Sequence, residues 1–160
     1  MVQRCSHARA CACVPKAIYG FAMSYRYTQS KLYLDTARKT ASYFIARVNA
    51  RFTADHVPAY DLDDVPAISP TNLTERDASA AAIAASGLLE LAQHGGADNE
   101  AYVALAAEML QSLVLGSFST RDLYNETEGA VQHCNALDTD VPWSDYYLAE
   151  AILRWRTTRT

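Results

Sequence analysis

The chain has 160 residues and half of them are hydrophobic, which is enough for one domain with a sizeable core and excludes a disordered protein. Lys and Arg number 14 against 18 Asp and Glu, a net charge of -4 without a basic block, so we expect no nucleic-acid partner. No uncharged run reaches the roughly 20 residues of a membrane span, and the N-terminus is too polar for a signal peptide. We therefore expect a cytoplasmic protein with no membrane partner.

Residues 1–16 show no periodicity, and we expect an irregular N-terminus there. This segment carries soft-metal ligand types at Cys5, His7, Cys11 and Cys13. Zinc knuckles pair their ligands across two-residue spacers, which are missing here, and no second ligand pair follows. We expect neither a metal nor any other cofactor, and the placement of the four cysteines is not that of a disulfide framework.

Two helices are expected next, one apolar and one amphipathic. Residues 17–27 are apolar on nearly all sides, whereas residues 32–48 repeat apolar side chains at intervals of three and four, with charged residues opposite. Residues 51–76 are rich in Pro and Asp, and three prolines there exclude a continuous helix, namely Pro58, Pro66 and Pro70. The first pair of helices is therefore followed by a long connection.

Residues 78–92 form the clearest predicted helix, because they are almost all small or aliphatic and include no Pro. The few polar side chains of this region share one narrow stripe, which consists of Ser79, Ser86, Glu90 and Gln93. A helix this apolar has to be covered on most sides. We expect an inner helix with a neighbour on each side and an outer layer behind it.

A short turn with glycine at the helix C-cap, residues 95–98, leads to an amphipathic helix over residues 99–115, with Asn99 as its cap. A second long connection, residues 117–142, precedes an apolar helix over residues 143–155, for which Ser144 is the expected N-cap.

The apolar helices recur at a nearly constant spacing, since Ile18, Ile83 and Tyr147 mark equivalent places 65 and 64 residues apart. The repeating unit is an apolar helix, a short turn, an amphipathic helix and a long connection. Because paired helices are antiparallel, the long connections all gather beside the starts of the apolar helices. Long connections are often functional, so we look for a ligand at that end.

Five strings stand out along the chain: IYGFAMSYRYT at 18–28, YLDTARKTASYFIAR at 33–47, VPAYDLDDVP at 57–66, RDASAAAIAASGLLEL at 76–91 and WSDYYLAEAILR at 143–154. Together they resemble unsaturated glucuronyl hydrolases, glycoside hydrolase family 88. The resemblance implies an all-α fold, a partial (α/α)6 barrel of about five helices in inner/outer antiparallel pairs. Residues 17–160 would be the C-terminal part of that domain.

The segment before the first string departs from the family. Family members carry a WARGQAW-like motif there, whose Arg and Trp help to hold the substrate, but this chain reads HARACACVPK, so the substrate arginine is not assigned. The family's two catalytic aspartates lie further upstream in its complete members. The resemblance thus implies a hydrolase fragment with no catalytic residue of its own, inactive alone, whose exposed barrel flanks favour self-association.

Family members release 4,5-unsaturated uronic acid from oligosaccharides that polysaccharide lyases produce. A carboxylic acid protonates the double bond of the vinyl ether, water adds, and the resulting hemiketal opens. Two alternatives remain: a fragment of an unsaturated rhamnogalacturonyl hydrolase, and a non-catalytic helical fragment that binds carbohydrate or serves as a scaffold for protein partners. The unit length argues against the scaffold, because helical solenoid repeats usually have about 34 to 45 residues.

Candidate substrate-binding residues lie at the starts of the apolar helices and in the second long connection; they are Asp77, Ser79, Trp143, Asp145, Tyr146 and His133. For Asp77, capping of the free backbone N–H groups is the simpler interpretation. A tyrosine at Tyr146 could stack on a sugar or hydrogen-bond it, as the resemblance implies. His133 resembles a histidine near the family's C-terminal motif, although a structural histidine is the simpler interpretation.

Overall fold

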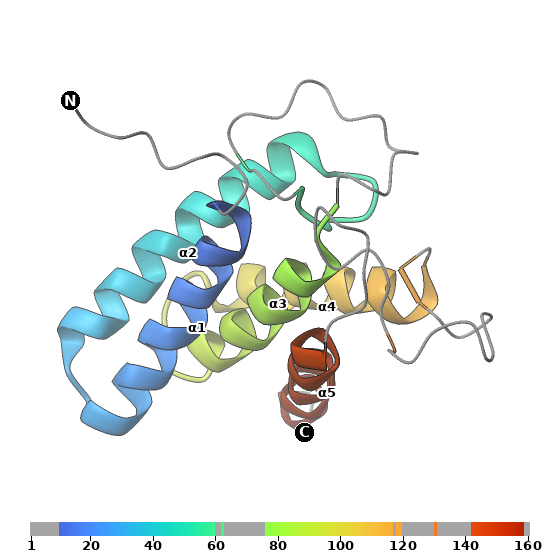
Figure 1. Cartoon of the computed structure of the whole chain (residues 1–160). Coiled ribbons are helices and arrows are strands. Elements are labelled where there is room, and N and C mark those ends of the chain that lie inside the picture. The colour runs from blue at the N-terminus through green and yellow to red at the C-terminus, as the bar shows by residue number, and fades with distance from the viewer. Residues whose placement is uncertain are drawn as a thin grey trace, which may run out of the picture.

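The computed structural model describes residues 10–59, 62, 76–116, 118–119, 130 and 142–158, with side chains from residue 13 onward. Five helices are found in these ranges: α1 (Ala10–Thr28), α2 (Lys31–Arg51), α3 (Ala78–Ala92), α4 (Asn99–Leu115) and α5 (Pro142–Thr157). In Figure 1, α3 lies between α1 and α5, with α2 beyond α1 and α4 behind α3. The expected all-α arrangement of inner and outer helices is confirmed.

Helix α3 is the centre of the fold, as its composition predicted. Every one of its residues from Ala78 to Leu91 is buried, and Ile83 and Leu88 are fully inaccessible. Its small side chains let neighbouring helices approach closely. A methyl group on Gly87 would lie only 2.9 Å from the backbone nitrogen of Tyr19, so α1 packs directly against this glycine.

Helix α1 begins earlier than the sequence predicted. It starts at Ala10 rather than at residue 17, and Pro15 lies inside it. A proline in the second turn removes one intrahelical hydrogen bond, the one that its N–H would have made to the carbonyl group of residue 11, and the helix continues. The small residues of the segment 10–13 have no strong turn signal, and two are alanine, which favours helix.

The outer helices α2 and α4 each have one buried stripe and one exposed side. On α2 the stripe is the predicted one in large part, and it consists of Leu34, Ala37, Ala41, Phe44 and Val48. On α4 it consists of Tyr102, Leu105, Ala106, Met109, Leu110 and Leu113. Each outer helix covers the inner helix that precedes it, and α4 also touches α5.

The short turns have the predicted glycines. Gly95 and Gly96 have φ of 73° and 133°, a region that only glycine enters without strain. Two predicted caps are wrong: the N-cap of α4 is Asp98, not Asn99, and α5 starts at Pro142, so Ser144 lies inside its first turn. Proline favours the first helical position because its fixed φ suits the helix and it has no N–H to leave unpaired.

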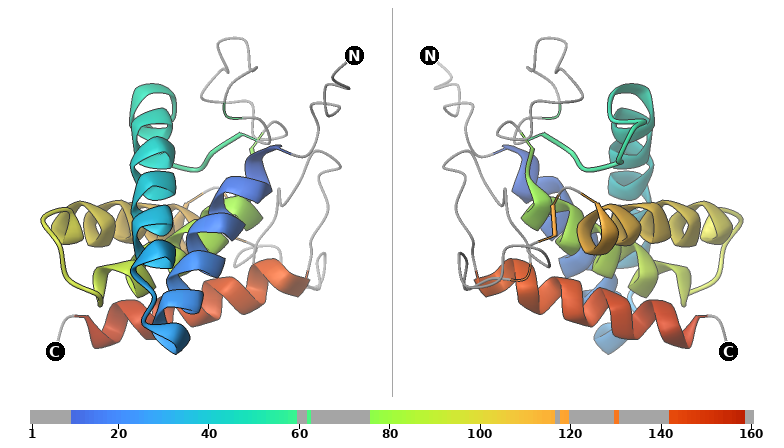
Figure 2. Two further views of the ribbon diagram at one scale, coloured as in Figure 1. Left: turned by 90° about the vertical axis from the view of Figure 1, so that its left-hand side faces the viewer. Right: turned by 90° about the vertical axis from the view of Figure 1, so that its right-hand side faces the viewer.

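The inner helices α1, α3 and α5 point the same way. Figure 2 shows their starts on one side of the molecule and their ends on the other, next to the short turns. None of the helices in the described ranges is long and apolar enough to cross a membrane.

Candidate functional site

The start of α3 is where the sequence placed Asp77 and Ser79. Asp77 is the N-cap: its Oδ1 accepts a hydrogen bond from the backbone N–H of Ala80 at 3.0 Å and another from the Ser79 hydroxyl at 2.6 Å. Both side chains are buried. Burial raises the pKa of Asp77, against the hydrogen bonds that favour its charged form. The geometry is that of a helix cap, the simpler of the two interpretations.

A neighbouring segment closes over this cap. Arg76 forms an ion pair with Asp55 at 3.2 Å, donates to the carbonyl oxygen of Val57, and lies with its guanidinium 4.9 Å from the ring centre of Phe52. The backbone N–H of Asp77 donates to the carbonyl oxygen of Pro58 at 2.8 Å. Residues 52–59 thus hold the start of α3 from outside, and the Asp77 carboxylate does not face open water.

The start of α5 is exposed and aromatic. Trp143 is 51% exposed and Tyr146 is 59% exposed. Tyr146 packs edge-to-face on Tyr147, which packs in the same way on Tyr19 of α1, each pair with ring centres 5.1 Å apart. Asp145 accepts a hydrogen bond from the backbone N–H of Ala130 at 3.0 Å. An exposed row of aromatic rings can stack on the apolar faces of a sugar. His133 lies outside the described residues.

A buried ionic cluster joins the three inner helices, and the sequence reasoning missed it. Glu90 on α3 is fully buried and lies 3.3 Å from Arg26 of α1 and 3.3 Å from Arg154 of α5. The Nε2 atom of His94 is also 3.3 Å from the Glu90 carboxylate, which places a third basic group beside it. A buried carboxylate needs such partners, because an unpaired charge in the interior is very costly.

The cluster continues toward the aromatic row. Arg154 pairs with Glu150 at 3.0 Å and donates to the carbonyl oxygen of Ser86 at 2.9 Å, while the Ser86 hydroxyl donates to Glu150 at 2.6 Å. The Tyr19 hydroxyl donates to Glu150 at 3.3 Å. Burial, and next the negative charge of Glu150, raise the pKa of Tyr19 to about 12. Each carboxylate of the cluster is therefore committed to cations and hydroxyl groups of neighbouring helices.

One sequence signal could have found this cluster. Ser86 and Glu90 belong to the polar stripe of the central helix, and a glutamate in a helix that must be buried demands a cationic partner. The signal does not name the partner, because Arg26 and Arg154 lie 64 residues away on either side.

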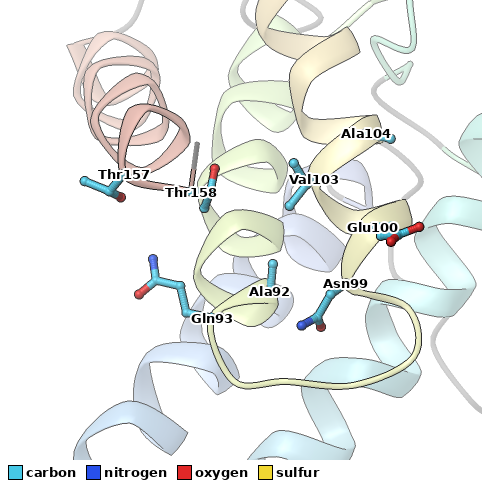
Figure 3. A pocket seen from close by; sticks show the side chains of 8 residues that line it. All are labelled: Ala92, Gln93, Asn99, Glu100, Val103, Ala104, Thr157 and Thr158. Carbon is cyan, nitrogen blue, oxygen red and sulfur yellow. The ribbon is translucent and has the colours of Figure 1, made fainter. Parts of the chain in front are cut away.

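The largest cavity lies at the opposite end, beside the short turn between α3 and α4 (Figure 3). It has a volume of about 700 Å³ and is lined by Ala92, Gln93, Asn99, Glu100, Val103, Ala104, Thr157 and Thr158. Its lining is mostly small or uncharged. We do not assign chemistry to it, because no group of acids, bases or nucleophiles meets there. Within the described part of the chain, no three His, Cys, Asp or Glu side chains come together as a metal site.

The chain is similar to known proteins over most of its length, although no family model matches it. An unsaturated glucuronyl hydrolase from Formosa agariphila is 35% identical over 144 residues, which are 86% of this chain and 34% of the relative. The crystal structure of the unsaturated glucuronyl hydrolase from Bacillus sp. GL1 is 30% identical, with a TM-score of 0.75 over 90% of this chain and 38% of that one. The chain is homologous to part of the unsaturated glucuronyl hydrolases.

A further solved unsaturated glucuronyl hydrolase, a variant with dGlcA-Glc-Rha-Glc, has a TM-score of 0.77 at 29% identity, covering 93% of this chain and 41% of its own. The five helices therefore match part of the (α/α)6 barrel of the unsaturated glucuronyl hydrolases, as the sequence strings implied. The chain spans about a third of the length of the curated relatives that it matches.

Proposed function

We propose that α1–α5 form part of the barrel wall of a hydrolase that releases 4,5-unsaturated uronic acid from oligosaccharides made by polysaccharide lyases. The observation that carries this proposal is the 35% identity to an unsaturated glucuronyl hydrolase over 86% of the chain. The solved relative with dGlcA-Glc-Rha-Glc supports an unsaturated oligosaccharide as the class of substrate. Polysaccharide degradation is the corresponding process.

The reaction needs a carboxylic acid that can protonate the double bond and a positioned water molecule. Among the described acids, Asp77 has a raised pKa, but it is buried and caps its own helix. Glu90 and Glu150 are bound to arginines of other helices. We therefore assign no catalytic residue, and we expect no turnover of an unsaturated disaccharide by this polypeptide alone.

The exposed aromatic side chains at the start of α5 are the proposed sugar contacts. Tyr146 offers both a ring face and a hydroxyl group to solvent, and Trp143 lies one turn before it. Asp145 is held by the backbone of Ala130 and would orient this turn. Asp77 and Ser79 would act indirectly, because they fix the start of α3.

A chimera tests the proposal. In the Bacillus sp. GL1 enzyme, the region that matches this chain is replaced by residues 17–158, and loss of the ultraviolet absorbance of the unsaturated uronide is followed. Turnover is the expected result. A folded chimera that turns over neither an unsaturated glucuronyl nor an unsaturated rhamnogalacturonyl disaccharide would contradict the proposal, and the preferred disaccharide distinguishes the two enzyme types.

Within the active chimera, Tyr146→Ala tests the sugar contact. We expect kcat/KM to fall about tenfold, since an aromatic contact is worth about 1.5 kcal/mol. Tyr43→Ala is the matched control, because Tyr43 is a partly exposed tyrosine on the outer helix α2, and it should leave kcat/KM unchanged. Equal effects of the two substitutions would remove Tyr146 from the site.

A further inference from the structure

The three inner helices repeat with a register of 64 residues. Side chains exactly this far apart meet directly in the cluster: Arg26 with Glu90, Ser86 with Glu150, and Glu90 with Arg154. Positions that differ by 64 therefore occupy equivalent places on α1, α3 and α5. The register allows each inner helix to be compared with the next one.

This comparison identifies an open side on α5. Ile18 on α1 and its equivalent on α3, Ala82, are both fully buried, and Ile18 packs on Gly87 of the next helix. The next equivalent position is Tyr146 on α5, which is 59% exposed. Leu153 behaves in the same way: its equivalent Leu89 is fully buried, but Leu153 is 62% exposed. This side, Tyr146, Ala149 and Leu153, is called the α5 edge.

A matching open side lies on α1. Leu148 on α5 and its equivalent Ala84 on α3 are buried against the preceding inner helix. Their equivalent on α1 is Gly20, which is exposed, and a methyl group on it would meet no atom within 4 Å. Tyr27 is likewise exposed, whereas its equivalent Leu91 is fully buried. This side, Lys16, Gly20 and Tyr27, is called the α1 edge.

The two edges are complementary by construction, since one is the forward side of an inner helix and the other is the side that receives it. A complete (α/α)6 barrel has six inner helices, and this chain contributes three of them. We propose that the 160-residue polypeptide forms a twofold-symmetric dimer in which the α5 edge of each copy packs on the α1 edge of the other, closing a ring of six inner helices.

A closed arrangement with two identical seams satisfies both edges at once, whereas a single contact would leave two edges in water. The side chains that it covers are large and apolar, including Tyr146, Leu153 and Tyr27, and such groups gain free energy when they leave water. The register also brings Arg154 level with Arg26 of the second copy. Each of them is already paired with Glu90 of its own copy, which limits the repulsion.

The register names the side chains that meet at the seam. Ile18 packs on Gly87 between α1 and α3, and the equivalent pair between α3 and α5 is Ala82 with Ala151, both fully buried. One step further, the pair is Tyr146 with Met23 of the second copy. Cysteines at these two positions should therefore form a disulfide between copies.

The first test is the mass of the polypeptide in solution by sedimentation velocity over a range of concentrations. A dimer of twice the 17.6 kDa chain mass is expected. Leu153→Glu should convert it to a monomer. Leu32→Glu is the matched control, because Leu32 is also exposed, at 70%, but lies on α2 outside both edges, and it should leave the dimer intact. A monomer at all concentrations, or growth into larger polymers, would overturn the proposal.

The second test is directional. In a chain whose four cysteines are replaced by serine, Tyr146→Cys and Met23→Cys variants are oxidised separately and as a mixture. A crosslinked dimer should form in the mixture and not in either variant alone. Crosslinking of the Tyr146→Cys variant with itself would overturn the edge-to-edge arrangement. Neither test depends on hydrolysis, so failure here leaves the proposed function standing, and failure of the chimera leaves the dimer standing.

Discussion

At the scale of single residues, Asp77 combines two opposing effects. Its carboxylate caps α3 through Ala80, which stabilises the helix start, but burial raises its pKa and penalises the charged form. Since the folded chain binds the proton more tightly than the unfolded chain, stability falls as the pH rises from about 4 through the folded pKa. At neutral pH the residue is useful as a cap and costly as a charge.

Asp77→Asn should separate these effects. Asparagine caps as well as aspartate and carries no charge, so the variant should be at least as stable as the parent at pH 7, and its advantage should shrink toward pH 4. Asp77→Ala should lose about 1 kcal/mol through the missing cap. Urea denaturation at several pH values measures both. An Asp77→Asn variant that loses as much as Asp77→Ala would show that the charge itself is needed.

Tyr19 should make the fold sensitive to alkali. Its pKa is raised to about 12 in the folded chain, by burial first and by Glu150 next. The unfolded chain releases this proton near pH 10, so stability should fall as the pH rises from 10 toward 12 and should not depend on Tyr19 below pH 10. Tyr19→Phe should flatten this part of the profile, measured by thermal unfolding between pH 8 and 11. An unchanged slope would argue that the other tyrosines with raised pKa, Tyr102 and Tyr147, dominate.

At the scale of helices, two glycines on inner helices have opposite surroundings. Gly87 on α3 touches the backbone of Tyr19 so closely that a methyl group would lie 2.9 Å from its nitrogen, whereas a methyl group on Gly20 of α1 meets nothing within 4 Å. Gly87→Ala should cost about 1–3 kcal/mol, because α1 must move away. Gly20→Ala should instead gain up to about 1 kcal/mol from helix propensity. Chemical denaturation of the two variants decides whether the contact or the propensity controls each site.

The helices were largely predictable, because their signals are local. The apolar composition of α3 and the spacing of apolar residues on α2 and α4 each fit within one element, and so does the cap at Asp77. The start of α1 was missed because Pro15 was taken as a boundary, although a proline near a helix start costs only one hydrogen bond. The cluster around Glu90 was missed for another reason: its partners are set by how three helices rotate against one another, which no single stretch of sequence encodes.

At the scale of the whole molecule, the three inner helices are joined by the cluster as well as by apolar packing. Arg154 of α5 reaches Glu90 and the carbonyl oxygen of Ser86 on α3 and lies 3.4 Å from the sulfur of Met23 on α1. The register of 64 residues makes these contacts possible, since it places the three side chains at one level. The cluster therefore specifies how far each inner helix is rotated and shifted.

Arg154→Met tests this role. The substitution keeps an apolar stem but leaves the fully buried Glu90 with Arg26, which is half exposed, and with His94. Breaking a buried pair by removing one partner costs roughly 3–5 kcal/mol, so the variant should unfold at much lower urea concentration. Arg156→Met, an exposed arginine two residues further on the same helix, should change stability by about 0.5 kcal/mol or less. In the double variant with Glu90→Gln the loss should be smaller than the sum of the single losses, because the stranded charge is gone. Equal and small effects of Arg154→Met and Arg156→Met would mean that apolar packing alone holds the three inner helices in register.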